Sequence, residues 1–73
     1  MKGKTTEQLA RIANAGGGFR LSAKDFSVDQ LARIANATGQ KPSRIEITDC
    51  ELLGTNQLAR IAQAGNGSVF FIG

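Results

Sequence analysis

The residues of this sequence best suited to chemistry are Asp49, Cys50 and Glu51, a thiol between two carboxylates. A cysteine nucleophile needs a general base, most often an imidazole, and the chain contains no histidine. A zinc site needs ligands that converge, whereas neighbouring residues at the end of a strand diverge. We therefore expect Cys50 to be a buried loop residue. We predict no catalytic residue, no metal ligand and no cofactor, and we do not expect an enzyme.

Three arginines, Arg11, Arg33 and Arg60, recur at one position of a repeated segment. If the repeat units stack, these arginines form a ladder that would contact phosphates or an acidic partner. Glu7 and Asp29 each stand four residues before one of the arginines, a spacing that favours ion pairs along one helix. We therefore favour a solvated helix face, and nucleic-acid binding through the arginine ladder is the alternative.

The glycines at 16–18 suggest a phosphate-binding loop by composition alone. Such a loop lies between a strand and the N-terminus of a helix, where the helix dipole faces the anion. Here the glycines follow a helical pattern and precede a strand pattern, so they predict helix termination instead.

The elements that position these residues are set by one octapeptide. QLARIANA begins at Gln8 and again at Gln30, and QLARIAQA begins at Gln57. In each copy the leucine, the isoleucine and the second alanine stand at i, i+3 and i+4, which predicts a helix with one apolar stripe. Such close identity indicates recent duplication or design from a consensus. A designed or reconstructed chain with no cellular function is therefore a further alternative.

Capping signals give the expected helix ends. Thr5 and Ser27 are N-cap residues with a glutamine three residues later, which completes a capping box, and Gly54 makes a poorer cap at the third place. Glycines follow each copy and stop the helix. The predicted helices span residues 6–15, 28–37 and 55–64.

Each predicted helix is followed by a candidate strand, at 19–22, 44–48 and 68–72. Strands separated by single helices are parallel and are joined by right-handed crossovers. We predict a single α/β domain with a three-stranded parallel sheet and all helices on one face. Its three helix–strand units span about residues 5–26, 27–52 and 53–73.

The segments FRLSAKDF and IEITDCEL follow the pattern L-x-L-x-x-(N/C)-x-L. The second segment has Ile45, Ile47 and Cys50 at the first three pattern positions, and the first segment has Lys24 where Cys50 stands. Over about residues 19–64 the chain resembles the leucine-rich repeat, and LARIA is similar to the helical half of the ribonuclease-inhibitor-like subclass. The resemblance implies an αβ mini-solenoid, in which Cys50 ties down the loop backbone.

The composition gives a net charge of +3, with 9 lysines and arginines that form no basic run. Charge this dilute is a weak signal for nucleic-acid binding. The longest apolar run, Val69 to Ile72, is far too short to span a membrane, and the start MKGKTTEQ lacks the apolar stretch of a signal peptide. One cysteine allows no intramolecular disulfide. We therefore expect a cytoplasmic protein.

The C-terminal segment SVFFIG gives the strongest functional hint. Val69 and Phe71 lie on one face of the expected strand, and Phe70 and Ile72 lie on the other. Whichever face packs on the helices, the other presents two large apolar side chains beside an open strand edge, which is typical of a contact site. The open face of the sheet would add polar residues to that site: Arg20, Ser22, Arg44, Glu46 and Thr48.

We therefore expect a non-catalytic protein–protein interaction or self-assembly module. Its expected partner is a second copy, with the two last strands paired antiparallel about a twofold axis in a six-stranded sheet. No membrane and no small-molecule partner is implied.

A DNA-binding alternative rests on residues 30–45, where LARIANATGQKPSRI has the form of a helix-turn-helix. Its turn would lie at Ala35 to Gly39 and a recognition helix would follow. Pro42 and the alternating RIEIT favour a strand there instead.

Overall fold

A computed structural model of the chain describes residues 4–38 and 43–72. Helices and strands alternate three times, which confirms the predicted α/β class and the three helix–strand units. The predicted ends of the helices and strands agree with the observed ends to within one residue. The elements are α1 (Thr6–Asn14), β1 (Phe19–Ser22), α2 (Val28–Ala37), β2 (Ile45–Thr48), the 3-10 helix η2 (Cys50–Leu52), α3 (Thr55–Gly65) and β3 (Val69–Phe71).

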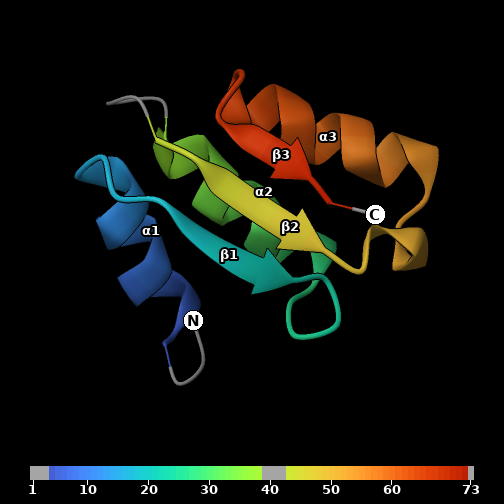
Figure 1. Cartoon of the computed structure of the whole chain (residues 1–73), viewed down its shortest axis with the longest axis horizontal. Helices are drawn as coiled ribbons and strands as arrows, with labels where there is room; N and C mark the ends of the chain where they lie inside the picture. Colours follow the sequence, from blue (N-terminus) through green and yellow to red (C-terminus); the bar gives the residue numbers. More distant parts are fainter. Residues whose placement is uncertain (1–3, 39–42, 73) are drawn as a thin grey trace.

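The three strands form one parallel sheet in the order β1-β2-β3, so β1 and β3 are its edges. All three helices cover one face of this sheet, and the other face is open (Figure 1). The helical layer is wider than the sheet, and α1 and α3 extend past the edge strands in Figure 1. This follows from packing distances, because helices pack about 8–10 Å apart and paired strands about 4.8 Å apart.

The helix starts follow the predicted capping chemistry. At Thr5 and Ser27 the hydroxyl accepts a hydrogen bond from the backbone N–H of the glutamine three residues on, and that glutamine's side chain accepts from the cap N–H in return. At Gly54 only half of this arrangement exists, because glycine has no side chain: its N–H donates to Gln57 Oε1 over 2.8 Å. The third helix therefore has the weakest N-terminus.

The core lies between the helices and one face of the sheet. Leu21, Ile45 and Ile47 point from the strands toward the helices and are at most 3% exposed. The alternation of RIEIT thus separates core from open face as expected. The largest fully buried side chains come from all three helices and from β2: Leu9, Leu31, Ile34, Ile45, Ile47 and Ile61.

The C-terminal end of α3 is a point of close approach. The Thr38 hydroxyl, which is 3% exposed, lies 2.6 Å from the Ala35 carbonyl oxygen and 3.1 Å from the Gly65 carbonyl oxygen, so it links the ends of α2 and α3. A Cβ on Gly65 would lie 2.3 Å from Val69 Cγ2. Glycine at this position allows β3 to leave the helix end directly beside it.

The fold contradicts the helix-turn-helix alternative. Residues 45–48 form β2 in the place of a recognition helix, so segment 30–45 is not a helix-turn-helix. Gly39, at the end of the expected turn, and Pro42, which argued against the recognition helix, lie outside the described residues. Within the described ranges, no helix combines the length and the apolar composition needed to cross a membrane.

Candidate interaction surface

The open face of the sheet collects the polar residues that the sequence singled out. The strand register places Arg20 beside Glu46 and Glu46 beside Phe70, in one row across the three strands. The second row begins with Ser22 beside Thr48. We use the term open face for the side chains on this surface: Arg20, Ser22, Arg44, Glu46, Thr48, Phe70 and Ile72.

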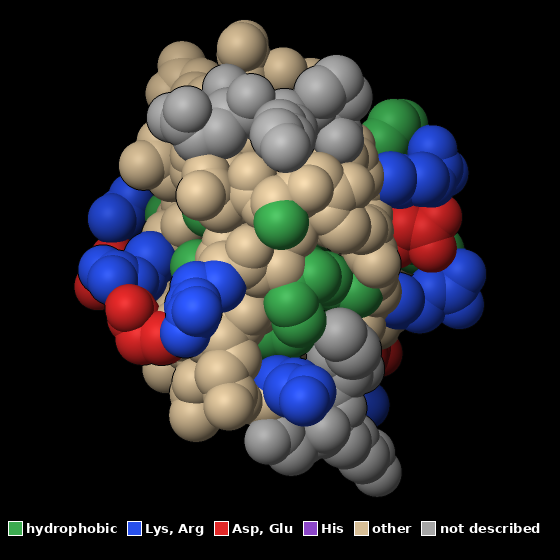
Figure 2. Space-filling view, turned by 90° about the vertical axis from the view of Figure 1, so that its left-hand side faces the viewer, with side chains coloured by type: hydrophobic (Ala, Val, Ile, Leu, Met, Phe, Trp, Pro, Cys, Tyr) green, Lys and Arg blue, Asp and Glu red, His purple; other side chains and the backbone are tan. Residues whose placement is uncertain are grey.

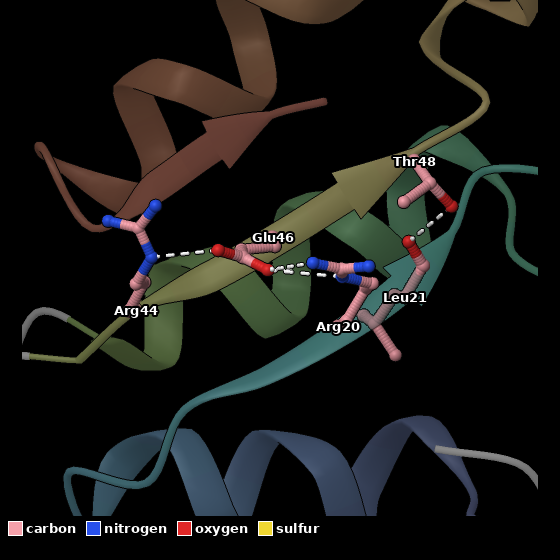
Figure 3. A network of polar contacts seen from close by, with 5 residues as sticks. All are labelled: Arg20, Leu21, Arg44, Glu46 and Thr48. Atoms are coloured by element: carbon pink, nitrogen blue, oxygen red, sulfur yellow. Dashed lines mark hydrogen bonds and ion pairs between the residues drawn. The ribbon is translucent and has the colours of Figure 1, made fainter. Parts of the chain in front are cut away.

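Glu46 lies at the centre of the open face and holds two arginines (Figure 3). Its Oε1 accepts hydrogen bonds from Arg20 Nε at 3.1 Å and Nη2 at 3.0 Å. Its Oε2 accepts from Arg44 Nε at 2.8 Å. Two guanidinium groups against one carboxylate leave this group of three with a net positive charge.

The two arginines change the acidity of the carboxylate between them. Hydrogen bonds from Arg44 and then Arg20 hold the pKa of Glu46 below its usual value, although partial desolvation acts in the opposite direction. The carboxylate is therefore ionised at neutral pH, and it fixes the orientation of both side chains.

Arg44 also covers Phe70 on the neighbouring strand. Its guanidinium carbon lies 3.8 Å from the centre of the Phe70 ring, a cation–π contact. Phe70 nevertheless remains 38% exposed. The open face thus presents an aromatic ring whose near side is occupied by a fixed arginine.

A second polar cluster lies at the C-terminal ends of β1 and β2. Asp49 Oδ2 accepts a 2.5 Å hydrogen bond from the Ser22 hydroxyl, and Lys24 Nζ lies 3.8 Å from Asp49 Oδ1. The hydrogen bond from Ser22, followed by the charge of Lys24 and a contact with Thr48, lowers the pKa of Asp49. This role of Asp49 was not predicted from the sequence. Its signal was an aspartate directly after a strand, because Asp tolerates the left-handed backbone, φ 59°, that Asp49 adopts.

The structure decides which face of the last strand packs on the helices, a question the sequence left open. Val69 and Phe71 are half-buried against the core, and Phe70 and Ile72 are exposed. A partner could therefore touch the side chains of Val69 and Phe71 only where they are left uncovered at the outer edge of the core, beside β3. Phe70 and Ile72 are the apolar side chains that β3 and its end present on the open face.

The backbone of β3 has an outward edge. The Ser68 carbonyl accepts from β2, and the Ile72 N–H donates to β2, each over 2.8 Å. In a parallel ladder, alternate residues bond to the same neighbouring strand. The N–H and C=O groups of Val69 and Phe71 therefore point away from β2, toward the side where a further strand would lie.

The helical arginines are exposed as expected, but their ion pairs differ from the prediction. Arg33 pairs with Glu7 of the preceding helix, and Arg60 Nη1 lies 2.7 Å from Asp29 Oδ1, also on the preceding helix. The predicted pairs along one helix are wrong, because the acid of one unit reaches the arginine of the next. Arg11 has no ion pair within residues 4–38 and 43–72.

Cys50 is a buried loop residue, 8% exposed, whose thiol lies 3.0 Å from the Ile47 carbonyl oxygen and donates to it. Burial raises the pKa of this thiol, so the reactive thiolate is disfavoured. No group of three or more histidine, cysteine, aspartate or glutamate residues is placed to hold a metal ion in the described part of the chain. Lys24, at the matching position of the first unit, instead points to solvent.

Comparisons of the chain with protein-family models, with curated proteins and with solved structures found no match. The chemistry of the surface is therefore read from its own residues: a positively charged group of three, an exposed aromatic ring and an outward strand edge.

Proposed function

We propose that this chain is a non-catalytic, cytoplasmic protein-interaction module whose partner is a second copy of itself. The observation that carries the proposal is the C-terminal end of the fold, where an outward backbone edge adjoins exposed apolar side chains. Phe70 and Ile72 are 38% and 36% exposed. Surface of this kind beside an unprotected strand edge is typical of protein contact.

The fold supports a binding role because its units match those of a solenoid. We propose that the three units are a small leucine-rich-repeat-like solenoid, in which each helix and strand packs mainly on its neighbours in the next unit. Solenoids of this kind need cover over the outward sides of their end units, and β3 presents such a side in its outward backbone edge. Burial of the end units by another copy would enlarge a core that is small for independent stability.

Two arrangements use the outward edge of β3. In the first, two β3 strands pair antiparallel about a twofold axis and form one six-stranded sheet. In the second, β3 of one copy pairs parallel with β1 of the next. Both bring a new strand beside Phe70, so one variant tests the shared proposal.

The test measures the molar mass in solution by light scattering after size exclusion, over a hundredfold range of concentration. We expect the mass to rise with concentration from 7.7 kDa toward twice that value or more. Phe70→Lys should weaken association about tenfold, because it removes apolar contact area and places like charges across the new strand pair. Gln63→Lys is the control, since it adds the same charge at an exposed position of α3. A wild-type monomer at all concentrations contradicts the proposal.

A further inference from the structure

One octapeptide is used in three helices, and its burial differs between them. In α2, which has a helix on each side, all four apolar residues of LARIA are at most 9% exposed: Leu31, Ala32, Ile34 and Ala35. In α1, Leu9 and Ala13 are fully buried, whereas Ala10 and Ile12 are half-buried. Ile12 is therefore the large apolar side chain that is less covered in α1, which has no preceding helix in the described part of the chain.

The last helix shows the reverse. Ile61 of α3 is fully buried, whereas Leu58 is half-buried and Ala59 and Ala62 are exposed. The leucine and the two alanines are therefore the residues that lose cover when the following helix is missing. The octapeptide thus has two contact sides, an isoleucine side toward the preceding unit and a leucine–alanine side toward the following unit.

The ion pairs have the same direction as the apolar contacts. The acid in the first turn of α1 and of α2 reaches the arginine of the following helix, in the pairs Glu7–Arg33 and Asp29–Arg60. At the first end of the helical layer, Arg11 of α1 has no acid of a preceding helix to pair with in the described part of the chain. Asn56 takes the place of the acid in α3. A helix placed after α3 would thus meet an uncharged hydrogen-bonding group.

We infer that a second copy docks head to tail, with its α1 against α3 and its β1 beside β3. This inference rests on the proposed self-association and specifies its geometry. Each exposed side has its complement at the other end of the same molecule: the leucine–alanine side of α3 fits the isoleucine side of α1, as it does at both internal junctions. The contact continues the helical layer and repeats a junction that the chain already forms twice.

The first end of the molecule has the surface that this docking requires. Seen from the side of α1, hydrophobic side chains lie between two groups of charged side chains, one on each flank (Figure 2). The half-buried residues at this end include Ile12 of α1 and Phe19 of β1. The opposite end presents Val69 and Phe71, whose backbone groups point outward in the direction that each internal strand uses toward its successor.

The twofold arrangement lacks this complementarity. It places the leucine–alanine side of α3 against an identical side and leaves the isoleucine side of both copies uncovered. A head-to-tail contact is heterologous, so assembly continues into a ring or a filament unless an end is blocked. Blocking one end in each of two variants therefore gives a decisive experiment.

The first variant, Ile12→Lys, blocks the α1 end, and the second, Ala62→Lys, blocks the α3 end. Ala62 is exposed, so its replacement leaves the fold intact. Ala15→Lys is a second α1-end variant in case Ile12→Lys unfolds, because Ala15 is exposed whereas its equivalent in α2, Ala37, is half-buried. The matched controls are Asn14→Lys and Gln63→Lys, because both positions correspond to Asn36, which stays exposed even in the central helix. Circular dichroism checks the fold of each variant, and light scattering gives the mass.

We expect each blocked variant alone to be a monomer, an equimolar mixture of the two to form a 1:1 dimer through the one intact junction, and both controls to assemble like the wild type. If Ile12→Lys alone still forms dimers, the contact is twofold through α3 and β3, and the head-to-tail inference is overturned. If the wild type assembles but the mixture stays monomeric, the inference is again overturned while the proposed self-association stands. A wild-type monomer at all concentrations overturns both.

A charge restored at the junction provides an independent test. Asn56→Asp recreates the acid of the other two units opposite the partner's Arg11. It should tighten association about twofold to fivefold at low salt, as expected for an exposed ion pair. Arg11→Ala added to Asn56→Asp should remove the gain, and 0.5 M salt should reduce it. Tightening that survives Arg11→Ala would overturn the inferred junction.

Discussion

The central and terminal helices of this protein carry nearly the same octapeptide and bury it differently. In α2 the apolar residues are enclosed on both sides, whereas α1 and α3 each leave one side uncovered. The local sequence determines which residues form the stripe. The position of the unit in the stack determines how much of the stripe is buried. In a short stack of helix–strand units, identical residues therefore make unequal contributions to stability.

The largest expected effect tests this inequality directly. Ile34→Ala in α2 should reduce the free energy of unfolding by about 3 kcal/mol, because Ile34 is fully buried and its removal leaves a cavity. Ile12→Ala, the same change in the same octapeptide, should cost about 1 kcal/mol, because Ile12 is half-buried. Urea unfolding at low protein concentration measures both. Equal losses would show that α1 is covered as fully as α2 in solution.

The next prediction concerns the third unit, in which β3 passes close to the helix end. Gly65→Ala places a Cβ 2.3 Å from Val69 Cγ2. Relief of this overlap must turn the Val69 side chain into a poorer rotamer or move β3 or the end of α3, and it should reduce the free energy of unfolding by about 1–3 kcal/mol. Gln63→Ala is the control, since it places an alanine at an exposed position of the same helix. Gly65→Ala with unchanged urea unfolding would contradict the close approach.

A smaller effect of opposite sign should make the third helix more like the other two. Gly54 has the backbone conformation of Thr5 and Ser27, with φ −78° and ψ 164°, and lacks only their hydroxyl. Gly54→Ser should complete the capping box and raise the free energy of unfolding by about 0.5 kcal/mol. The reverse change, Ser27→Gly, should lower it by a similar amount. Thermal unfolding with matched buffers resolves the difference, and a loss of stability in Gly54→Ser would contradict the cap geometry.

The smallest expected effect is on the pH dependence of stability, and it tests the contacts that Glu46 of the central strand makes with its neighbours. Hydrogen bonds from Arg44 and Arg20 lower the folded-state pKa of Glu46 from the usual 4.5. The stabilisation is therefore fully present above pH 4.5, and it is lost as the pH falls through the lower folded-state value. Glu46→Gln should flatten this part of the dependence of urea midpoints on pH, whereas Glu51→Gln, at an exposed position, serves as the control. Identical profiles for Glu46→Gln and the wild type would contradict the role of the arginines.

Most of the fold was predictable because local chemistry specifies it. The capping boxes at Thr5 and Ser27 and the spacing of the octapeptide gave the helix starts and the buried stripe. The alternation of Ile45 and Ile47 gave the central strand. These signals act over a few residues, so a single sequence contains them completely.

The parts that were missed depend on contacts between units. Arg33 has an acid four residues before it on its own helix, and another within reach on the preceding helix; the spacing along the chain cannot choose between them. The face of β3 was likewise undetermined, because apolar residues occupy both faces of VFFI. The ring of Phe70 turns outward since Val69 and Phe71 continue the core face of β2 in register.

The residues of the open face were predicted from the sequence, whereas the contacts between them were not. Arg20, Arg44 and Glu46 were expected on the open face. One carboxylate that orients both arginines was not, since that arrangement requires the register of β1 and β2. Asp49 was considered only as a metal ligand, although its contact is with Ser22 on a neighbouring strand.

The buried Cys50 thiol offers a way to measure local opening of the fold without an added label site. Its environment suppresses reaction with alkylating reagents until η2 or the end of β3 separates from the core, so the rate of labelling reads the frequency of that event. The backbone of Ile72, directly after β3, contributes to the surroundings of this sulfur. A second molecule seated against the last strand would hold that cover in place, and the thiol would then be labelled more slowly as the protein concentration rises.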